Sequence, residues 1–323
     1  MKYSDKTITK LQLLPGIEPY PQRQESVPLI TAPISLTHYS ILTFTEQICG
    51  LTRLGNKMFR IAATIAATVT HHTKFVMIQP EPDCPWMSDL QSLFISLKET
   101  TPLIPSKWMN SWEGISEAGF SLFTRIIPTN VNATVFGYRQ SWKYFITPSE
   151  KQAVRDIFKF TSKYESYAHN VLTTASNNTS PILVGVHMRI GDLLYEQSVN
   201  FGYQPANKTF YDKVLKKVTS NLNNSNNIVF VASSDSPKLA KQMLKDAEAK
   251  YKIFWLNGTA FEDFATLSKC NHSIISGGTY GFWTAWLAGG KTFYFENFAK
   301  RGSYFDRGFL PGNFYLPDWI GIS

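Results

Sequence analysis

The segment ILVGVHMRIGD, residues 182–192, decides how the chain folds. Its first five residues form an apolar run that is typical of a buried strand in a parallel sheet. The run ends in a polar cluster of His187, Arg189 and Asp192. Because open α/β sheets bind ligands at the carboxyl ends of their strands, the segment predicts a strand that leads into a binding site. Arg189 can bind a phosphate bidentately, and the alternative is a simple salt bridge between Arg189 and Asp192.

Two downstream segments repeat this arrangement. Residues 228–232 are apolar and lead into Ser233 and Asp235, which a helix is predicted to follow. Residues 272–275 lead into the sequence SGGTYG, residues 276–281, and then into a long apolar stretch. Glycines and hydroxyl groups between a strand and a helix present backbone N–H groups to an anion. The three strand ends therefore predict one shared anion site.

The half of the chain after residue 179 alternates strands and helices. Further strands are predicted at residues 251–256 and 292–295, and further helices at 211–221 and 261–269. Four strand–helix pairs that close on a strand indicate a parallel sheet with helices on both faces.

The first half of the chain has a different organisation. Residues 1–38 are rich in proline and predict an extended arm, and residues 39–178 predict a separate domain. A linker is expected at residues 176–181. The expected elements of this domain are strands at residues 40–45, 74–78 and 134–137 and helices at residues 58–70 and 148–175.

The composition narrows the possible classes of protein. The chain has 323 residues, 43% hydrophobic and 17% charged, so about two folded domains are expected and wholesale disorder is not. The net charge of +8 suits an anionic ligand, but the basic residues are scattered, so no nucleic-acid partner is expected. No apolar run reaches 18 residues and the first ten residues are polar, so neither a transmembrane helix nor a signal peptide is readable.

Possible N-glycosylation sites give modest support for the lumen of the secretory pathway. The sequons begin at Asn132, Asn177, Asn178, Asn207, Asn223, Asn257 and Asn271. The three cysteines lie too far apart for a zinc-finger pattern.

Three blocks, in this order, resemble the GDP-fucose-dependent α1,2-fucosyltransferases of glycosyltransferase family 11. The first is RLGN at residues 53–56, which is similar to the glycine–asparagine turn of that family. The second is HMRIGD at residues 187–192, which is similar to the His-x-Arg-Arg-x-Asp donor motif. The third runs from CNHSI to GTYGFW at residues 270–283 and is followed by LPDWIG at residues 316–321.

This resemblance implies an α/β, GT-B-like fold of two Rossmann-like domains that face each other across a cleft. Residues 39–178 would bind the acceptor and residues 179–323 would bind GDP-fucose. The implied reaction is inverting transfer of L-fucose to the 2-hydroxyl of a galactose-containing glycan. The alternatives are another acceptor, such as a protein hydroxyl, or an inactive glycan- or nucleotide-binding homologue. The resemblance also implies the Golgi lumen or cisterna membrane, with any membrane contact made through a targeting segment that is not readable here.

The resemblance and the strand ends together suggest the site residues. The expected catalytic residues are His187, Asp192 and Glu196, with Asp192 either orienting Arg189 or acting as general base and Glu196 as the rival base. The chain has no Asp-x-Asp motif and the family resembles the metal-independent kind, so neither a metal nor a cofactor is expected. The expected donor-binding residues are Arg189, Ser233, Asp235, Gly278, Thr279, Tyr280, Gly281, Gly55 and Asn56.

One residue departs from the family motif. Ile190 stands where the second arginine is usual, so one potential phosphate contact, which would contribute ~1.5–3 kcal/mol, is absent. Either that arginine is not essential, another cation compensates, or the activity of this chain has drifted. If the site has kept its shape, Ile190→Arg is expected to tighten GDP-fucose binding.

Overall fold

The structure is a computed structural model in which ten segments are described. The extended arm expected at residues 1–38 lies outside them, as do the sequons at Asn132, Asn178 and Asn223. The described residues are 41–44, 53–78, 86–99, 101, 103–104, 113–115, 133–135, 137–177, 179–222 and 227–323.

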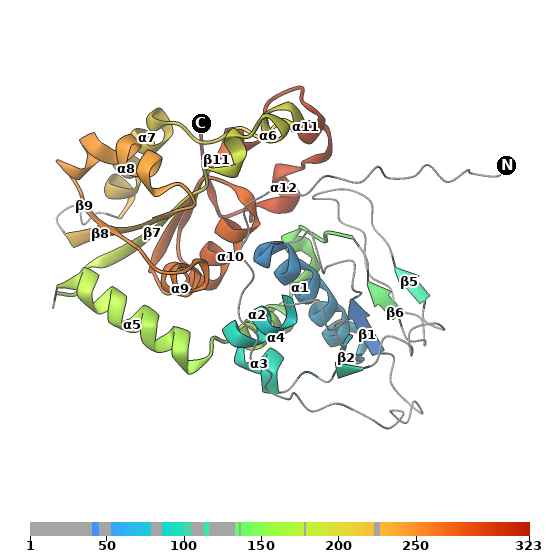
Figure 1. Cartoon of the computed structure of the whole chain (residues 1–323). Coiled ribbons are helices and arrows are strands. Elements are labelled where there is room, and N and C mark those ends of the chain that lie inside the picture. Colours follow the sequence, from blue (N-terminus) through green and yellow to red (C-terminus); the bar gives the residue numbers. More distant parts are fainter. Residues whose placement is uncertain are drawn as a thin grey trace.

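The C-terminal half is built on a six-stranded parallel sheet in the order β12-β11-β10-β7-β8-β9 (Figure 1). Numbered from β7, this is the strand order 6-5-4-1-2-3, which is the doubly wound order of a Rossmann fold. The sequence predicted every strand except the last, which is only three residues long. The strands are β7 (Ile182–Met188), β8 (Ile228–Ser234), β9 (Lys252–Trp255), β10 (His272–Ile275), β11 (Thr292–Phe295) and β12 (Ile320–Ile322).

Helices cover both faces of this sheet. In Figure 1, α7 and α8 lie on one face, and α9 and α10 lie on the other. A strand between two helical layers is covered on both faces, so its side chains do not alternate between buried and exposed. Accordingly, six of the seven residues of β8 are buried. The helices of this half are α6 (Glu196–Phe201), α7 (Lys208–Asn221), α8 (Pro237–Glu248), α9 (Ala260–Leu267), α10 (Gly278–Ala288), α11 (Tyr304–Gly308) and α12 (Pro311–Phe314).

The described part of the N-terminal half holds a smaller parallel sheet, in the order β2-β1-β6-β5, and a two-stranded sheet of β3 and β4. Helix α1 packs against β1 and is buried along most of its length. No helix among the described residues is long and apolar enough to cross a bilayer. The elements are β1 (Ile41–Phe44), α1 (Leu54–His71), β2 (Lys74–Phe75), β3 (Met77–Ile78), α2 (Trp86–Leu93), α3 (Ile95–Glu99), β4 (Leu103–Ile104), β5 (Glu113–Ile115) and β6 (Ala133–Val135).

The α/β fold of two parallel-sheet halves is therefore confirmed, but the single long helix expected at residues 148–175 is wrong. The segment forms two helices, α4 (Pro148–Ile157) and α5 (Ser162–Ser176). Between them the chain extends and pairs with the end of α2. Thr161 donates its N–H to the Leu93 carbonyl at 2.9 Å, and Lys159 accepts the N–H of Ile95 at 2.9 Å. These long-range hydrogen bonds override a local helical pattern. The domain boundary at residues 178/179 stays a prediction, and α5 packs on α9 of the C-terminal half.

A continuous apolar core joins the two halves where α1 meets α10. The ring of Phe59 lies 4.6 Å from Phe282, 5.0 Å from Trp283 and 5.8 Å from Phe314. The indole N–H of Trp283 donates to the carbonyl of Gly55 at 3.0 Å. The two halves therefore share one core, and their relative position is fixed by close packing.

We predict that Phe59→Ala lowers the free energy of unfolding by about 3–5 kcal/mol, because it opens a cavity between rings that belong to both halves. Leu239→Ala on the surface of α8 is the matched control and should stay within about 1 kcal/mol of the native protein. Urea unfolding followed by circular dichroism measures both. An unchanged transition for Phe59→Ala would contradict the shared core.

Candidate active site

A pocket of about 620 Å³ lies between the two halves. It opens beside β7. In the sheet, β8 is the neighbour of β7 on one side and β10 is its neighbour on the other. This reversal of strand order is where doubly wound sheets bind ligands. The side chains that line it come from both halves and include Arg53, Asn56, Lys57, Asp89, Tyr138, Gln140, His187, Arg189, Tyr203, Ser233, Ser234, Asp235, Asp263, Thr279 and Tyr280.

Arg189 and Asp192 form a two-pronged ion pair at the end of β7. Arg189 donates from Nε to Oδ1 of Asp192 at 3.1 Å and from Nη2 to Oδ2 at 2.9 Å. Burial alone would raise the pKa of Asp192, but bonding to Arg189 and the nearby charge of Arg53 hold that pKa below its usual range. A carboxylate with a depressed pKa is a weak base. The geometry therefore favours the orienting role for Asp192 over the role of general base.

The three predicted loops, which follow β7, β8 and β10, meet at one edge of the sheet, as expected. Asp235 accepts the backbone N–H groups of Ile190 at 2.8 Å and Gly191 at 3.0 Å. The Ser276 hydroxyl accepts the backbone N–H of Arg189 at 2.8 Å. These bonds fix the backbone on which the Arg189 side chain stands.

The position of Ile190 overturns the expectation for Ile190→Arg. The Ile190 side chain has no exposed surface and packs in the core. Ile190 lies two residues beyond the end of β7 and is buried, as Val186 and Met188 are, whereas His187 and Arg189 line the pocket. An arginine at position 190 would start from the core side of the strand end, so tighter donor binding is not expected from it.

The N-terminus of α10 lies directly against the Arg189 side chain at the pocket. Gly278 has a φ of +78°, and a Cβ there would lie 2.4 Å from Arg189 Nη1, so only glycine allows this approach. The first N–H groups of a helix have no partners within the helix and carry the positive end of its dipole. Arg189 and the first turn of α10 thus form a site suited to an anion.

His187 lies between these groups in a neutral state. Its ring stacks on Tyr280 with centroids 4.8 Å apart. Burial and the charge of Arg189 lower the pKa of His187 to about 3. Gly281 lies behind the imidazole, because a Cβ there would be 2.7 Å from Nδ1. His187 can therefore donate or accept a hydrogen bond at neutral pH but adds no charge.

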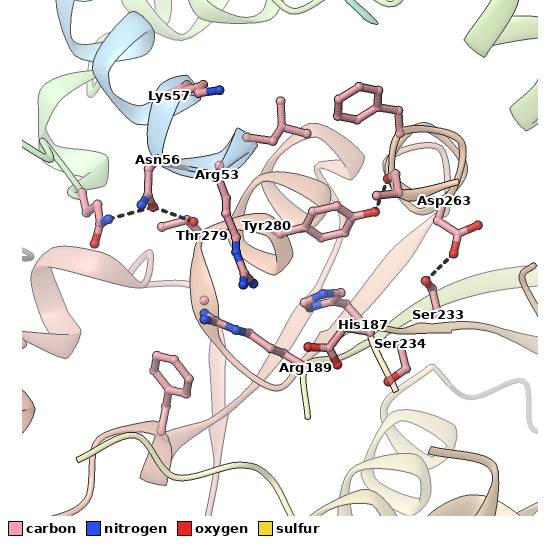
Figure 2. Close-up of a pocket in the computed structure, with 18 of the residues that line it drawn as sticks. Arg53, Asn56, Lys57, His187, Arg189, Ser233, Ser234, Asp263, Thr279 and Tyr280 are labelled. Carbon is pink, nitrogen blue, oxygen red and sulfur yellow. Dashed lines mark hydrogen bonds between the residues drawn. The ribbon is translucent and has the colours of Figure 1, made fainter. Parts of the chain in front are cut away.

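The remaining predicted residues make contacts of other kinds. Ser233 bonds to Asp263 at 2.5 Å, and Asp263 also accepts the N–H of Gly258 at 3.1 Å. Asn56 Oδ1 accepts the Thr279 hydroxyl at 2.9 Å and the Gln140 amide at 3.0 Å, so it joins the two halves at the pocket wall (Figure 2).

Three predicted residues are absent from the pocket wall. Asp192 is paired with Arg189 and Arg53, Gly281 packs against His187, and Glu196 is exposed at the start of α6. Their predicted roles stay predictions, as do those of the residues that line the pocket.

Sequence reasoning missed several charged side chains of the pocket. Arg53 and Lys57 flank the Gly55–Asn56 turn, which was itself a signal for the site. Asp89 and Asp263 lie on helices with no motif around them. Loss of surrounding water lowers the pKa of Lys57 to about 8 and raises the pKa of Asp89, and the two groups partly offset each other. Burial also raises the pKa of Asp263.

Within the described segments, no three histidine, cysteine, aspartate or glutamate side chains gather into a group that could hold a metal ion.

Comparison with known proteins assigns the family. Residues 20–323 match the model of Glycosyl transferase family 11. The chain belongs to this family. It is 27% identical over 313 residues to galactoside alpha-(1,2)-fucosyltransferase 1 of Rattus norvegicus, covering 94% of this chain and 78% of that protein. It is 30% identical over 194 residues to the protein of the same name from Lagothrix lagotricha, covering 58% of this chain and 51% of that one.

Solved structures of fucosyltransferases are also similar, at low identity. NodZ from Bradyrhizobium has a TM-score of 0.47 and 12% identity, covering 77% of this chain and 92% of that chain. POFUT1 in complex with GDP has a TM-score of 0.44 and 11% identity, covering 79% and 95%.

The buried His187 predicts a loss of stability in mild acid. An unfolded histidine has a pKa of about 6.5, whereas folded His187 has a pKa of about 3. The unfolded state therefore binds an extra proton below about pH 6.5, and stability falls by at most about 1.4 kcal/mol per pH unit as pH decreases. Below the folded pKa the loss is complete.

The measurement is urea unfolding at several pH values between about 7 and 5, where carboxylates contribute little. His187→Gln should show a shallower decline than the native protein, and His169→Gln, at an exposed position, should follow the native curve. Parallel curves for the native protein and His187→Gln would show that His187 is not the responsible group.

Proposed function

We propose that this chain transfers L-fucose from GDP-fucose to the 2-hydroxyl of a galactose-containing glycan, with inversion at the fucose carbon and without a metal ion. Family membership and the names of the mammalian relatives support the reaction class. The observation that carries the proposal is the convergence of Arg189 and the α10 N-terminus in the pocket between the halves.

The leaving diphosphate gains negative charge as the bond from fucose to oxygen breaks. The bonds of Arg189 to Asp192 use Nε and Nη2, and Nη1 lies beside Gly278 at the start of α10. Donors fixed in place before the reaction stabilise such charge without reorganisation. His187 can add one neutral hydrogen bond. Asp192 holds the Arg189 fork in this orientation.

The nucleoside would lie along the wall formed by β8 and α9. Asp263 is nearly buried and its carboxylate is held by Ser233 and the Gly258 N–H. A carboxylate fixed in this way suits the N–H groups of guanine or a ribose hydroxyl. Asp235 suits this role less well, because its Oδ1 already accepts two backbone N–H groups.

The acceptor would enter from the N-terminal wall, where Lys57, Asp89, Tyr138 and Gln140 lie. The acceptor hydroxyl must lose a proton during transfer. Burial raises the pKa of Asp89, as it does that of Asp263 on the nucleoside side, whereas the pKa of Asp192 is lowered, so Asp89 is a stronger base than Asp192. We include Asp89 beside Glu196 as a candidate general base.

We also propose a Golgi location, by family resemblance. The exposure of the sequon residues Asn177 and Asn257 supports a lumenal setting.

The decisive experiment incubates purified protein with GDP-fucose and lactose, with EDTA present in a parallel reaction. The expected product carries an α1,2-linked fucose, identified by NMR, and forms equally well in EDTA. Complete loss of transferase activity in EDTA, with recovery when manganese is added, would contradict the metal-independent mechanism. Binding of GDP-fucose without turnover on any acceptor would instead indicate an inactive homologue, the alternative that the Ile190 substitution raises.

Arg189→Ala should lower kcat/KM by about 30- to 1000-fold, or ~2–4 kcal/mol, because it removes the charge that faces the leaving diphosphate. Arg189→Lys should recover little, since a point charge cannot reproduce the planar fork that Asp192 holds. Arg301→Ala, at an exposed position, is the control. Native GDP affinity for Arg189→Ala, measured by calorimetry, would show that the cluster at the strand end is purely structural.

A further inference from the structure

We infer that Arg53 is a second diphosphate-binding cation, supplied by the N-terminal half. This inference rests on the proposed nucleotide donor. It assigns to the start of α1 a role in binding the leaving group.

The location of Arg53 is the first argument. Arg53 precedes α1 and lines the pocket. Figure 2 shows its side chain reaching from the start of α1 toward Arg189, past Thr279 and Tyr280. The guanidinium thus extends from the N-terminal half to the anion site of the C-terminal half.

The bonding of Arg53 is the second argument. Its Nη1 donates to Oδ2 of Asp192 at 2.9 Å, the same oxygen that accepts Arg189 Nη2 at 2.9 Å. Among the described residues, Arg53 has no other hydrogen bond, so Nε and Nη2 keep their donors. Its side chain is 74% exposed, whereas that of Arg189 is 22% exposed. A ligand in the pocket can reach Arg53 without breaking any buried contact.

The charge balance is the third argument. Asp192 is already neutralised by the bidentate fork of Arg189, so a second guanidinium on the same oxygen exceeds the charge of that carboxylate. The nearest other carboxylate at the strand end, Asp235, accepts the backbone N–H groups of residues 190 and 191. Asp192 and Asp235 match the charges of the two guanidiniums, so the positive potential that remains comes from the N-terminus of α10, and the donors that remain are those of Arg53 that no carboxylate occupies. A diphosphate, with at least two negative charges, suits both.

The test compares GDP with guanosine, because only GDP carries the charges that Arg53 would bind. Calorimetric titration of Arg53→Gln should show a GDP affinity about tenfold to a hundredfold weaker than that of the native protein, and guanosine affinity changed by less than about threefold. The GDP affinity of Arg53→Lys should lie between that of the native protein and that of Arg53→Gln. Arg301→Gln, an exposed arginine elsewhere on the C-terminal half, should bind both ligands as the native protein does.

A second background separates direct binding from an effect through Asp192. In Asp192→Asn protein, Arg53→Gln should still weaken GDP binding by about tenfold or more, because the diphosphate contact does not require the carboxylate. No further loss in that background would mean that Arg53 acts only by holding Asp192, and the inference would fall. Equal losses for GDP and guanosine would assign Arg53 a structural role and would also overturn it.

These outcomes are distinct from failure of the proposed function. If the native protein binds neither GDP nor GDP-fucose, the proposed donor is wrong. If the native protein binds GDP and Arg53→Gln binds it equally well, only the role of Arg53 is wrong. Thermal unfolding by circular dichroism verifies that each variant is folded, which is expected for a side chain as exposed as Arg53.

Discussion

The close contact between the first turns of α1 and α10 is the constraint on which the rest of the structure depends. A Cβ at Gly55 would lie 2.5 Å from the backbone carbonyl carbon of Thr279, so the two helix starts touch through bare backbone. Two hydrogen bonds stabilise the same contact, one from the Trp283 indole to the Gly55 carbonyl and one from the Thr279 hydroxyl to Asn56. Because Arg53 precedes α1 and the anion-binding N–H groups begin α10, the joint between the halves also builds the pocket. A glycine in the family turn is therefore needed for packing as much as for any ligand.

The positions predicted best from the sequence were those with a repeated physical signal. Three apolar runs that end in polar loops gave three parallel strands and one shared edge, because strand polarity and helix N-termini follow from local sequence. The break between α4 and α5 could not be read in the same way, since it depends on hydrogen bonds from residues 93 and 95, far away in the chain. The presence of Asp263 and Asp89 in the pocket could not be predicted from the sequence for a related reason. Each lies on an ordinary amphipathic helix and acquires its environment only from tertiary contacts.

The orientation of Ile190 is instructive because the signal was present in the sequence. Successive side chains of a strand point to opposite faces, so Val186 and Met188 share one face of β7 and His187 lies on the other. Just beyond the strand, Arg189 lines the pocket as His187 does, and Ile190 is buried as Val186 and Met188 are. Comparison with the family motif suggested a lost phosphate ligand, whereas the apolar pattern of residues 186, 188 and 190 indicates a core residue. The backbone N–H of Ile190 still contributes, through its bond to Asp235.

The magnitudes of the contacts across the pocket indicate which of them hold the halves together and which are available to a ligand. The rings of Phe59, Phe282, Trp283 and Phe314 are nearly or fully buried, and removing one such ring costs several kcal/mol. The Arg53–Asp192 ion pair is largely solvated on the Arg53 side, and exposed pairs contribute only about 0–1 kcal/mol. The apolar core therefore fixes the two halves with or without that pair. The fold does not need the charge of Arg53, which shares the Asp192 carboxylate with Arg189. The N–H donors of Arg53 can therefore turn to an incoming anion at little cost in stability.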